Sequence, residues 1–123
     1  MNYLLTFVGG GLGSMTRLAV GTVFSRWLGT AWPFGTLFIN VTGSLIIGLF
    51  LTLTGEKLGL APAWRYFVAT GFLGGYTTFS TFEYETQRLV ELGTPGYAGA
   101  YVVASVVLGF GAAMLGVVIA RRV

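Results

Sequence analysis

The residues best suited to ion chemistry lie in one short stretch, "GGYTTFSTF" at positions 74–82. Gly74 and Gly75 are followed closely by Thr77 and Thr78, and glycine with β-branched residues weakens a helix. A break at membrane depth frees backbone carbonyls, which are tolerated only where they are buried in protein or line a cavity. Such carbonyls suit a bound cation. The stretch therefore predicts a broken helix with cation-binding chemistry.

The second half of the same stretch carries two phenylalanines, Phe79 and Phe82. They are three residues apart, so both rings project from one face of a helix. The edge of an aromatic ring is positive and attracts a small anion without a charged group. Ser80 and Thr81 lie between the rings and are unusual on a surface that faces lipid. Ordinary packing of phenylalanine is the alternative, and the residues alone leave it open.

Two columns of polar residues at a spacing of four occur elsewhere in apolar sequence. One consists of Thr36, Asn40, Ser44 and Gly48, and the other of Tyr101, Ser105 and Gly109. Residues at this spacing share a helix face. Polar groups within a membrane usually face the bundle interior or a wet pathway. A purely adhesive hydrogen bond from Asn40 and an interfacial place for Tyr101 are alternatives, but two columns together could line one route.

Few charged side chains accompany these columns. Arg17 is the only basic residue within an expected span, where it could snorkel, pair with a glutamate or attract anions. Glu83 is expected to be a solvated helix-end charge, and Glu85 could reach back into a vestibule. The lining thus offers hydroxyls, one amide and ring edges without a central carboxylate. Such a set of donors favours an anion over a cation or a proton-driven substrate.

The composition requires a membrane around these groups. Of 123 residues, 54% are hydrophobic and 9% charged, and a soluble domain this small could not bury so much apolar surface. Cysteine, histidine and aspartate are absent, which removes thiolate sites, histidine acid–base catalysis and the usual zinc sites. The net charge of +3 is too sparsely distributed to indicate nucleic-acid binding. We therefore expect an integral membrane protein that is not an enzyme.

The elements that must position these residues follow from hydropathy. The expected spans are residues 3–25, 34–54, 64–91 with a break at 74–78, and 96–120. Each is close to or longer than the roughly 20 residues that a spanning helix needs. The expected fold is a single all-α membrane domain with four transmembrane helices per chain, the third broken near its middle.

The basic residues give only a weak signal for orientation. One side of the membrane would hold Lys57, Arg65, Arg121 and Arg122, and the other Arg26 and Arg88. Basic residues prefer the cytoplasmic side, and so small a bias allows insertion in both orientations. An antiparallel pair is therefore possible, and a single orientation is equally compatible with the charges.

The chain resembles the Fluc (CrcB-type) fluoride channels of bacteria and archaea. The resemblance rests on "GGYTTFSTF" at 74–82, "GTLFINVTGSLIIG" at 35–48 and "GGGLGSMTR" at 9–17, and it covers essentially the whole chain. It implies a dual-topology, antiparallel homodimer in the plasma (inner) membrane, with two fluoride pathways. It also implies a structural sodium ion at the dimer centre and passive export of cytoplasmic fluoride.

The resemblance also implies roles for individual residues. The implied fluoride pathway consists of Asn40, Phe79, Phe82, Tyr101 and Ser105, with Ser80 and Thr81 beside the rings. The carbonyls of Gly74 and Thr77 match those that hold sodium. Arg17 matches the arginine of the first helix, and Glu85 the acidic position after "FSTF". Gly109 stands where some members carry a further hydroxyl, so it is given no ligand role.

Two other functions fit a small four-helix membrane protein. A small multidrug transporter of similar length requires a membrane-embedded glutamate in its first helix, and residues 3–23 contain no acidic residue. A membrane subunit that transports nothing needs few hydroxyls, so the two polar columns argue against it. A fluoride channel is the function that we expect.

Overall fold

Connectors rich in glycine and proline divide the chain into long helical stretches. Gly29, Gly59 and Gly93 adopt φ angles of 74°, 52° and 77°, a left-handed conformation that glycine adopts without steric cost. Pro62 and Pro95 begin the helices that follow two of these glycines, where a missing N–H costs nothing. The turns are thus encoded locally, by glycine in a left-handed conformation and by proline at the next helix start.

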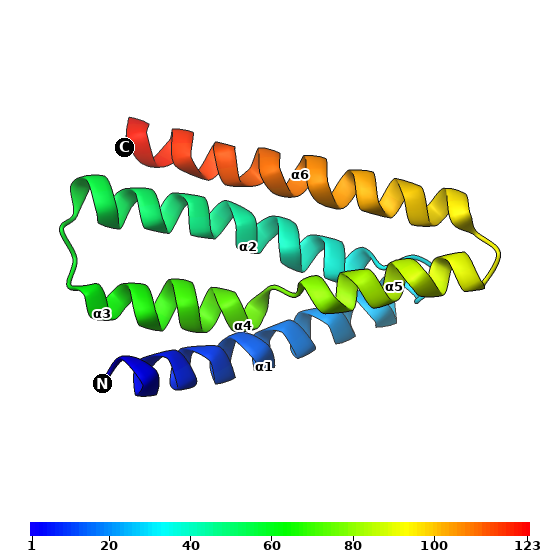
Figure 1. Ribbon diagram of the computed structural model, residues 1–123, viewed down its shortest axis with the longest axis horizontal. Coiled ribbons are helices and arrows are strands. Elements are labelled where there is room, and N and C mark those ends of the chain that lie inside the picture. Colours follow the sequence, from blue (N-terminus) through cyan, green and yellow to red (C-terminus); the bar gives the residue numbers. More distant parts are fainter.

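The computed structural model describes all residues, 1–123, and is entirely helical. The elements in chain order are α1 (Asn2–Leu28), α2 (Phe34–Thr52), the π-helical η1 (Leu53–Lys57), α3 (Pro62–Trp64), the π-helical η2 (Arg65–Leu73), α4 (Gly74–Tyr76), α5 (Phe79–Glu91) and α6 (Pro95–Arg122). They form four long stretches. These run back and forth, and both termini lie at the same end (Figure 1). The expected all-α chain with four helices is confirmed.

Two of these stretches are long and apolar enough to cross a membrane by length and composition, namely Phe34–Lys57 and Pro95–Arg122. We expected four such spans. The first stretch contains Arg17 and many glycine and hydroxyl residues, which lower its hydropathy. The third is divided into shorter helices by its break. Polar and flexible residues therefore weaken the membrane signal in the two stretches that carry most of the special backbone.

Very little of the chain is buried within itself. Only 17 of 123 residues are buried, and large apolar side chains cover the outside of α1 and α6. A soluble protein of this length would hide far more apolar surface, so the exposed side chains indicate a lipid environment. The small core cluster consists of Phe82, Leu89, Ala98 and Tyr101, with Trp32 and Leu37 packed against it.

Glycine lets the helices approach closely. A Cβ atom on Gly13 would overlap the Phe72 carbonyl oxygen, and one on Gly75 would overlap that of Gly10. On the other side of the molecule, a Cβ on Gly116 would overlap the Leu45 carbonyl oxygen. Close backbone packing of this kind drives helix association in lipid, where the hydrophobic effect between helices is lost. It joins α1 to the third stretch, and α6 to α2.

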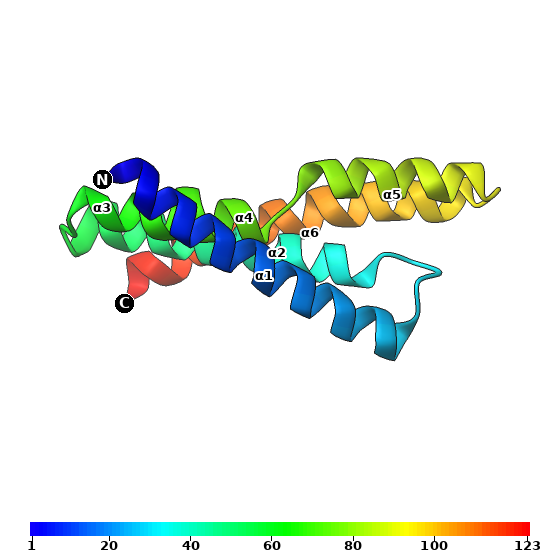
Figure 2. The same cartoon turned by 90° about the horizontal axis from the view of Figure 1, so that it is seen from below.

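The third stretch is interrupted at two residues. Thr77 (φ −80°, ψ 159°) and Thr78 (φ −153°, ψ 119°) are extended, and the chain crosses from α4 to α5 at this point (Figure 2). The expected break at 74–78 is therefore wider than the observed one, since Gly74 to Tyr76 stay helical. The β-branched threonines make the break, whereas Gly75 serves the close contact with α1.

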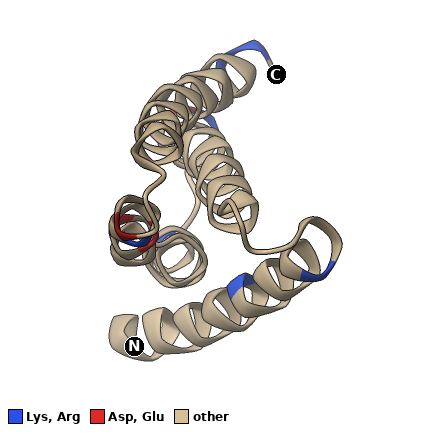
Figure 3. Cartoon of the chain, turned by 90° about the vertical axis from the view of Figure 1, so that its right-hand side faces the viewer, with Lys and Arg blue, Asp and Glu red and all other residues tan.

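Charged residues are confined to a few places (Figure 3). The glutamates of α5 form one acidic group, and basic residues mark α1 and the C-terminal end of α6. At that end Arg121 Nη2 donates to Glu56 Oε1 over 2.9 Å, and Lys57 Nζ donates to the Arg121 carbonyl over 3.0 Å. These contacts fasten the C-terminal helix to the end of the second stretch.

Candidate functional site

Asn40 bridges the break in the third stretch. Its Nδ2 donates to the Thr78 carbonyl over 3.0 Å, and its Oδ1 accepts from the Thr78 N–H over 2.8 Å. Both ends of the amide therefore satisfy the extended backbone, which a membrane leaves without water partners. A primary amide has two N–H groups, so one donor of Asn40 remains for another partner.

The bridge leaves a carbonyl free. In an unbroken helix the Thr78 N–H would donate to the carbonyl of Gly74, four residues earlier. It donates to Asn40 instead, so Gly74 loses that partner. The Thr77 carbonyl points out of the helical ladder and accepts from Arg17 Nη1 over 3.4 Å. The two carbonyls expected to hold a cation are thus both outside regular helical pairing.

A cavity of about 300 Å³ lies beside the break. It is lined by Asn40, Gly43, Ser44, Ile47, Leu73, Thr77, Thr78, Phe79, Phe82, Ser105 and Val106. None of these residues is charged. The hydroxyl of Ser105 is buried and has no hydrogen-bond partner, which is rare for a polar atom in a protein interior. The wall of the cavity therefore contains a hydroxyl without a hydrogen-bond partner and no competing carboxylate.

The N-terminus of α5 borders the same cavity. Thr78 caps this helix, with its Oγ1 accepting from the Thr81 N–H over 3.3 Å. The first N–H groups of a helix carry a positive partial charge, which favours an anion nearby. Because Thr77, Thr78 and Phe79 all line the cavity, this end of the helix contributes to its electrostatics.

Three aromatic rings follow one another along the site. The centroids of Phe79 and Phe82 are 5.7 Å apart with the planes tilted by 53°, and those of Phe82 and Tyr101 are 5.1 Å apart at 69°. The second pair is edge-to-face, the arrangement that aromatic quadrupoles prefer. Phe82 is 7% exposed, whereas Phe79 is 74% exposed and projects away from the chain.

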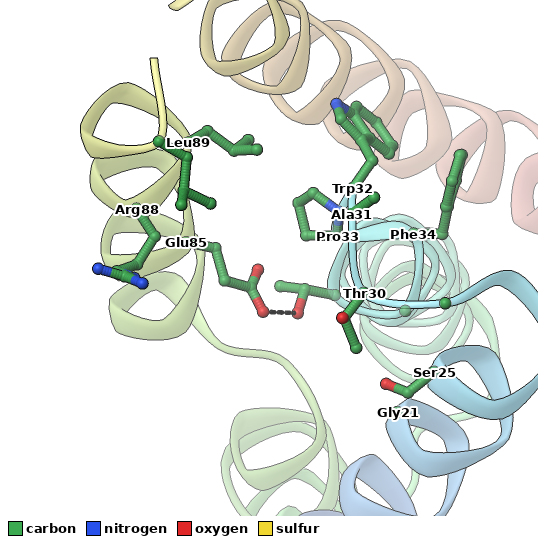
Figure 4. Close-up of a pocket in the computed structure, with 14 residues that line it drawn as sticks. Gly21, Ser25, Thr30, Ala31, Trp32, Pro33, Phe34, Glu85, Arg88 and Leu89 are labelled. Carbon is green, nitrogen blue, oxygen red and sulfur yellow. Dashed lines mark hydrogen bonds between the residues drawn. The ribbon is translucent and has the colours of Figure 1, made fainter. Parts of the chain in front are cut away.

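Glu85 lies at the outer end of this row, one turn beyond Phe82. Its Oε1 accepts from Thr36 Oγ1 over 2.8 Å, the bond drawn dashed in Figure 4. Its Oε2 accepts from the fully buried Tyr101 hydroxyl over 2.7 Å. A second cavity, of about 340 Å³, contains this carboxylate together with Trp32 and Arg88. One acidic group thus holds hydroxyls from both α2 and α6.

The structure brings together most of the residues singled out from the sequence. Asn40, Phe79, Phe82 and Ser105 line one cavity, while Tyr101 packs on Phe82 and points its hydroxyl at Glu85. Gly109 lies near Ser44 without closing the space.

Ser80 and Thr81 lie elsewhere. Both are exposed, and neither lines the cavity with the rings. Thr81 Oγ1 accepts from Thr78 Oγ1 over 3.0 Å and faces a separate groove that contains Arg17. Their assignment to the fluoride pathway stays a prediction, without a place in this cavity.

Three contributors were not on the expected list of site residues. Thr36 was visible in the sequence as the first member of its column, and the contact with Glu85 gives it a role. Thr78 stands directly before the helical "FSTF", the position at which threonine caps a helix. Trp32 packs edge-on against Tyr101 with centroids 5.3 Å apart, a contact that no local pattern indicates.

The broken helix, the uncharged cavity and the apolar membrane-length helices define a helical membrane protein built around a polar site. Comparison with known families agrees with this class. The chain belongs to the CrcB family, described as "CrcB-like protein, Camphor Resistance (CrcB)", whose profile matches residues 4–117. The resemblance noted in the sequence is thereby confirmed.

Its relatives carry a consistent name. The fluoride-specific ion channel FluC of Acidobacterium capsulatum is 48% identical over 123 residues, covering 100% of this chain and 98% of the relative. That of Nitrobacter winogradskyi is 50% identical over 118 residues, covering 96% and 94%. FluC 1 of Nitrobacter hamburgensis is 51% identical over the same length, covering 96% and 94%. These names place the family among ion channels, which are not enzymes.

Proposed function

We propose that the chain is a fluoride-selective channel of the bacterial or archaeal plasma (inner) membrane. Cytoplasmic fluoride leaves through it passively, down the electrochemical gradient, and toxicity is relieved. The observation that carries this proposal is the uncharged cavity with the unpartnered Ser105 hydroxyl between the polar columns of α2 and α6. The choice of fluoride as the transported ion is supported by the names of the relatives, which are fluoride-specific ion channels.

The geometry suits a small anion. Ser105, Asn40, Phe79 and Phe82 all line one cavity, so a hydroxyl, an amide N–H and ring edges could serve one anion there. Fluoride loses a tightly held water shell when it enters a protein, and closely spaced donors replace that shell. Chloride is larger and is coordinated poorly by donors fitted to fluoride. Selectivity therefore comes from the fit of neutral donors.

In this proposal Glu85 lies between the uncharged cavity and the aqueous end of the pathway. Its carboxylate already occupies the hydroxyls of Thr36 and Tyr101. An anion that advances to this level takes over these donors as the carboxylate turns away. The exchange keeps each hydroxyl bonded throughout, so no buried donor is left without a partner.

A second, antiparallel copy completes the protein in this proposal. A groove of about 620 Å³ lies open in the single chain and is lined mainly by polar residues, among them Ser14, Arg17, Thr22 and Thr81. A polar groove at membrane depth requires a partner or water, because lipid satisfies no hydrogen bonds. The exposed ring of Phe79 directly follows the break and would meet the second copy. Two copies give two pathways, and the weak charge bias permits both orientations.

A structural sodium ion fits the centre of such a pair. The Gly74 carbonyl has lost its helical donor, and the Thr77 carbonyl lies outside the ladder. Two copies supply four such oxygens, hard neutral ligands that suit sodium and need no carboxylate. The ion would hold the two breaks together and is not transported.

Ion efflux from liposomes that contain the purified full chain tests the proposal. We expect fluoride, followed with a fluoride electrode, to leave rapidly in sodium-containing buffer and chloride to stay. Equal fluxes of the two ions, or no fluoride flux above that of empty liposomes, would overturn the fluoride channel. Fluoride flux without any sodium requirement would overturn only the sodium site.

A further inference from the structure

Arg17 is a cation placed against one of the proposed sodium ligands. Its side chain is half-buried on α1, and its Nη1 donates to the Thr77 carbonyl oxygen over 3.4 Å. The ion pairs of the chain are Arg88 with Glu91 and Arg121 with Glu56, so no carboxylate neutralises Arg17. An unneutralised positive charge therefore lies next to a carbonyl that the proposed function assigns to another cation.

The shape of the break does not depend on this contact. Asn40 makes two hydrogen bonds to Thr78, of 3.0 and 2.8 Å. The N–H and Oγ1 of Thr77 both donate to the Leu73 carbonyl, over 3.0 and 2.8 Å. The Arg17 bond of 3.4 Å is longer than all of these and beyond the usual range for N–H to oxygen. Removing it leaves the extended residues held by their other partners.

We propose that Arg17 sets the sodium affinity of the break by weakening it. Its guanidinium competes for the electron density of the Thr77 carbonyl and repels a cation bound there. This repulsion is stronger than in bulk water because the guanidinium is half-buried. The inference rests on the sodium site of the proposed function and names Arg17 as the residue that lowers the sodium affinity of that site. Arg17 is not a sodium ligand in this proposal, since it acts through the carbonyl and through its own charge.

The test measures sodium binding to the purified full-length protein in detergent, without reference to transport. The melting temperature is recorded against sodium chloride, with choline chloride keeping the ionic strength constant, and equilibrium binding of radioactive sodium is measured alongside. Neutral variants Arg17→Gln and Arg17→Met remove the charge, and Arg17→Lys keeps it. Arg26→Gln, on the same helix but without a hydrogen bond to the break, is the matched control.

We expect half-saturating sodium to fall by about tenfold in the neutral variants, as loss of a nearby unit charge in a medium of intermediate dielectric implies. Arg17→Lys and Arg26→Gln should stay within about twofold of the unchanged chain, because both leave a charge at position 17. An unchanged or higher half-saturating concentration in both neutral variants overturns the inference while leaving the sodium site intact.

Two further outcomes also decide the matter. If sodium neither stabilises nor binds the unchanged chain, the sodium site of the proposed function fails and takes this inference with it. If both neutral variants fail to fold while Arg17→Lys folds, Arg17 is needed for the break itself. That result contradicts the claim that Asn40 and Leu73 hold the backbone without it.

Discussion

At the scale of single residues, Asn40 links the broken backbone to the cavity. Its carboxamide donates to the Thr78 carbonyl and accepts from the Thr78 N–H. The second N–H of the amide remains available for another partner. Glu85 lies at the other end of the row of aromatic rings. Its carboxylate accepts hydrogen bonds from two hydroxyls, those of Thr36 and Tyr101. Both residues work because they combine several hydrogen bonds on one side chain. Replacing either side chain should therefore disturb several hydrogen bonds of the site at once.

Asn40→Asp should suppress fluoride efflux at least tenfold. The new carboxylate can still accept from the Thr78 N–H, but it cannot donate to the Thr78 carbonyl or to an anion, and it adds negative charge to the cavity. The efflux rate from liposomes gives the measurement. Asn2→Asp, the same change at an exposed end of α1, is the control and should conduct normally. Unimpaired flux in Asn40→Asp would remove Asn40 from the pathway.

Phe82→Ile should also suppress efflux while leaving the assembly intact. Isoleucine fills much of the buried space but has no positive ring edge to offer an anion or the Tyr101 ring. We expect a loss of stability of about 1–2 kcal/mol from imperfect packing. Phe110→Ile, at a ring 69% exposed on α6, should leave flux and size-exclusion elution unchanged. Equal flux in the two variants would show that the Phe82 ring does not act on the ion.

At the scale of elements, close packing of α1 on the third stretch places the break. Gly13→Ala should destabilise the fold by about 1–3 kcal/mol, because the new methyl group overlaps the Phe72 carbonyl oxygen and pushes the helices apart. Gly11→Ala, two residues earlier and with nothing within 4 Å, should be neutral or slightly stabilising. Melting curves in detergent provide the comparison. Equal stability of the two variants would mean that this contact is not tight.

The helices themselves were predictable because each follows from a local pattern. Apolar runs of membrane length gave the stretches, and the glycine and proline connectors gave their ends. A spacing of four residues predicted that Asn40 and Ser44 share a helix face, and a spacing of three predicted the same for Phe79 and Phe82. All four residues line one cavity. The exact break was not predictable, since glycine can serve either flexibility or close contact. Gly75 serves contact, and the threonines alone are extended.

The faces of α5 were harder to predict for a related reason. Two extended residues separate α4 from α5, so the rotation of one helix no longer fixes that of the other. Ser80 and Thr81 therefore point outward although they lie within the conspicuous motif. The contacts of Glu85 with Thr36 and Tyr101 depend on how α2, α5 and α6 pack, and no spacing within one helix encodes them.

At the scale of the whole molecule, the polar groove at the break supports the proposed antiparallel pair. The Arg17 groove and the exposed Phe79 ring both lie at the level of the break, and the polar groove requires a partner or water within a membrane. A second copy in the opposite orientation would place the two helix breaks next to each other. The Gly74 and Thr77 carbonyls of both copies, four in all, would then surround the two-fold axis of the pair.

This arrangement predicts that each connector is found on both sides of the membrane. The chain contains no cysteine, so a single introduced thiol reports its own position. Ala61→Cys and Leu92→Cys place it in exposed connectors at opposite ends of the helices. In intact spheroplasts, a maleimide that does not cross the membrane should label about half of the copies of each variant, as equal insertion in both orientations requires. Labelling after lysis gives the total for each variant. If one variant is labelled completely from outside and the other not at all, every copy has the same orientation and the antiparallel pair is excluded.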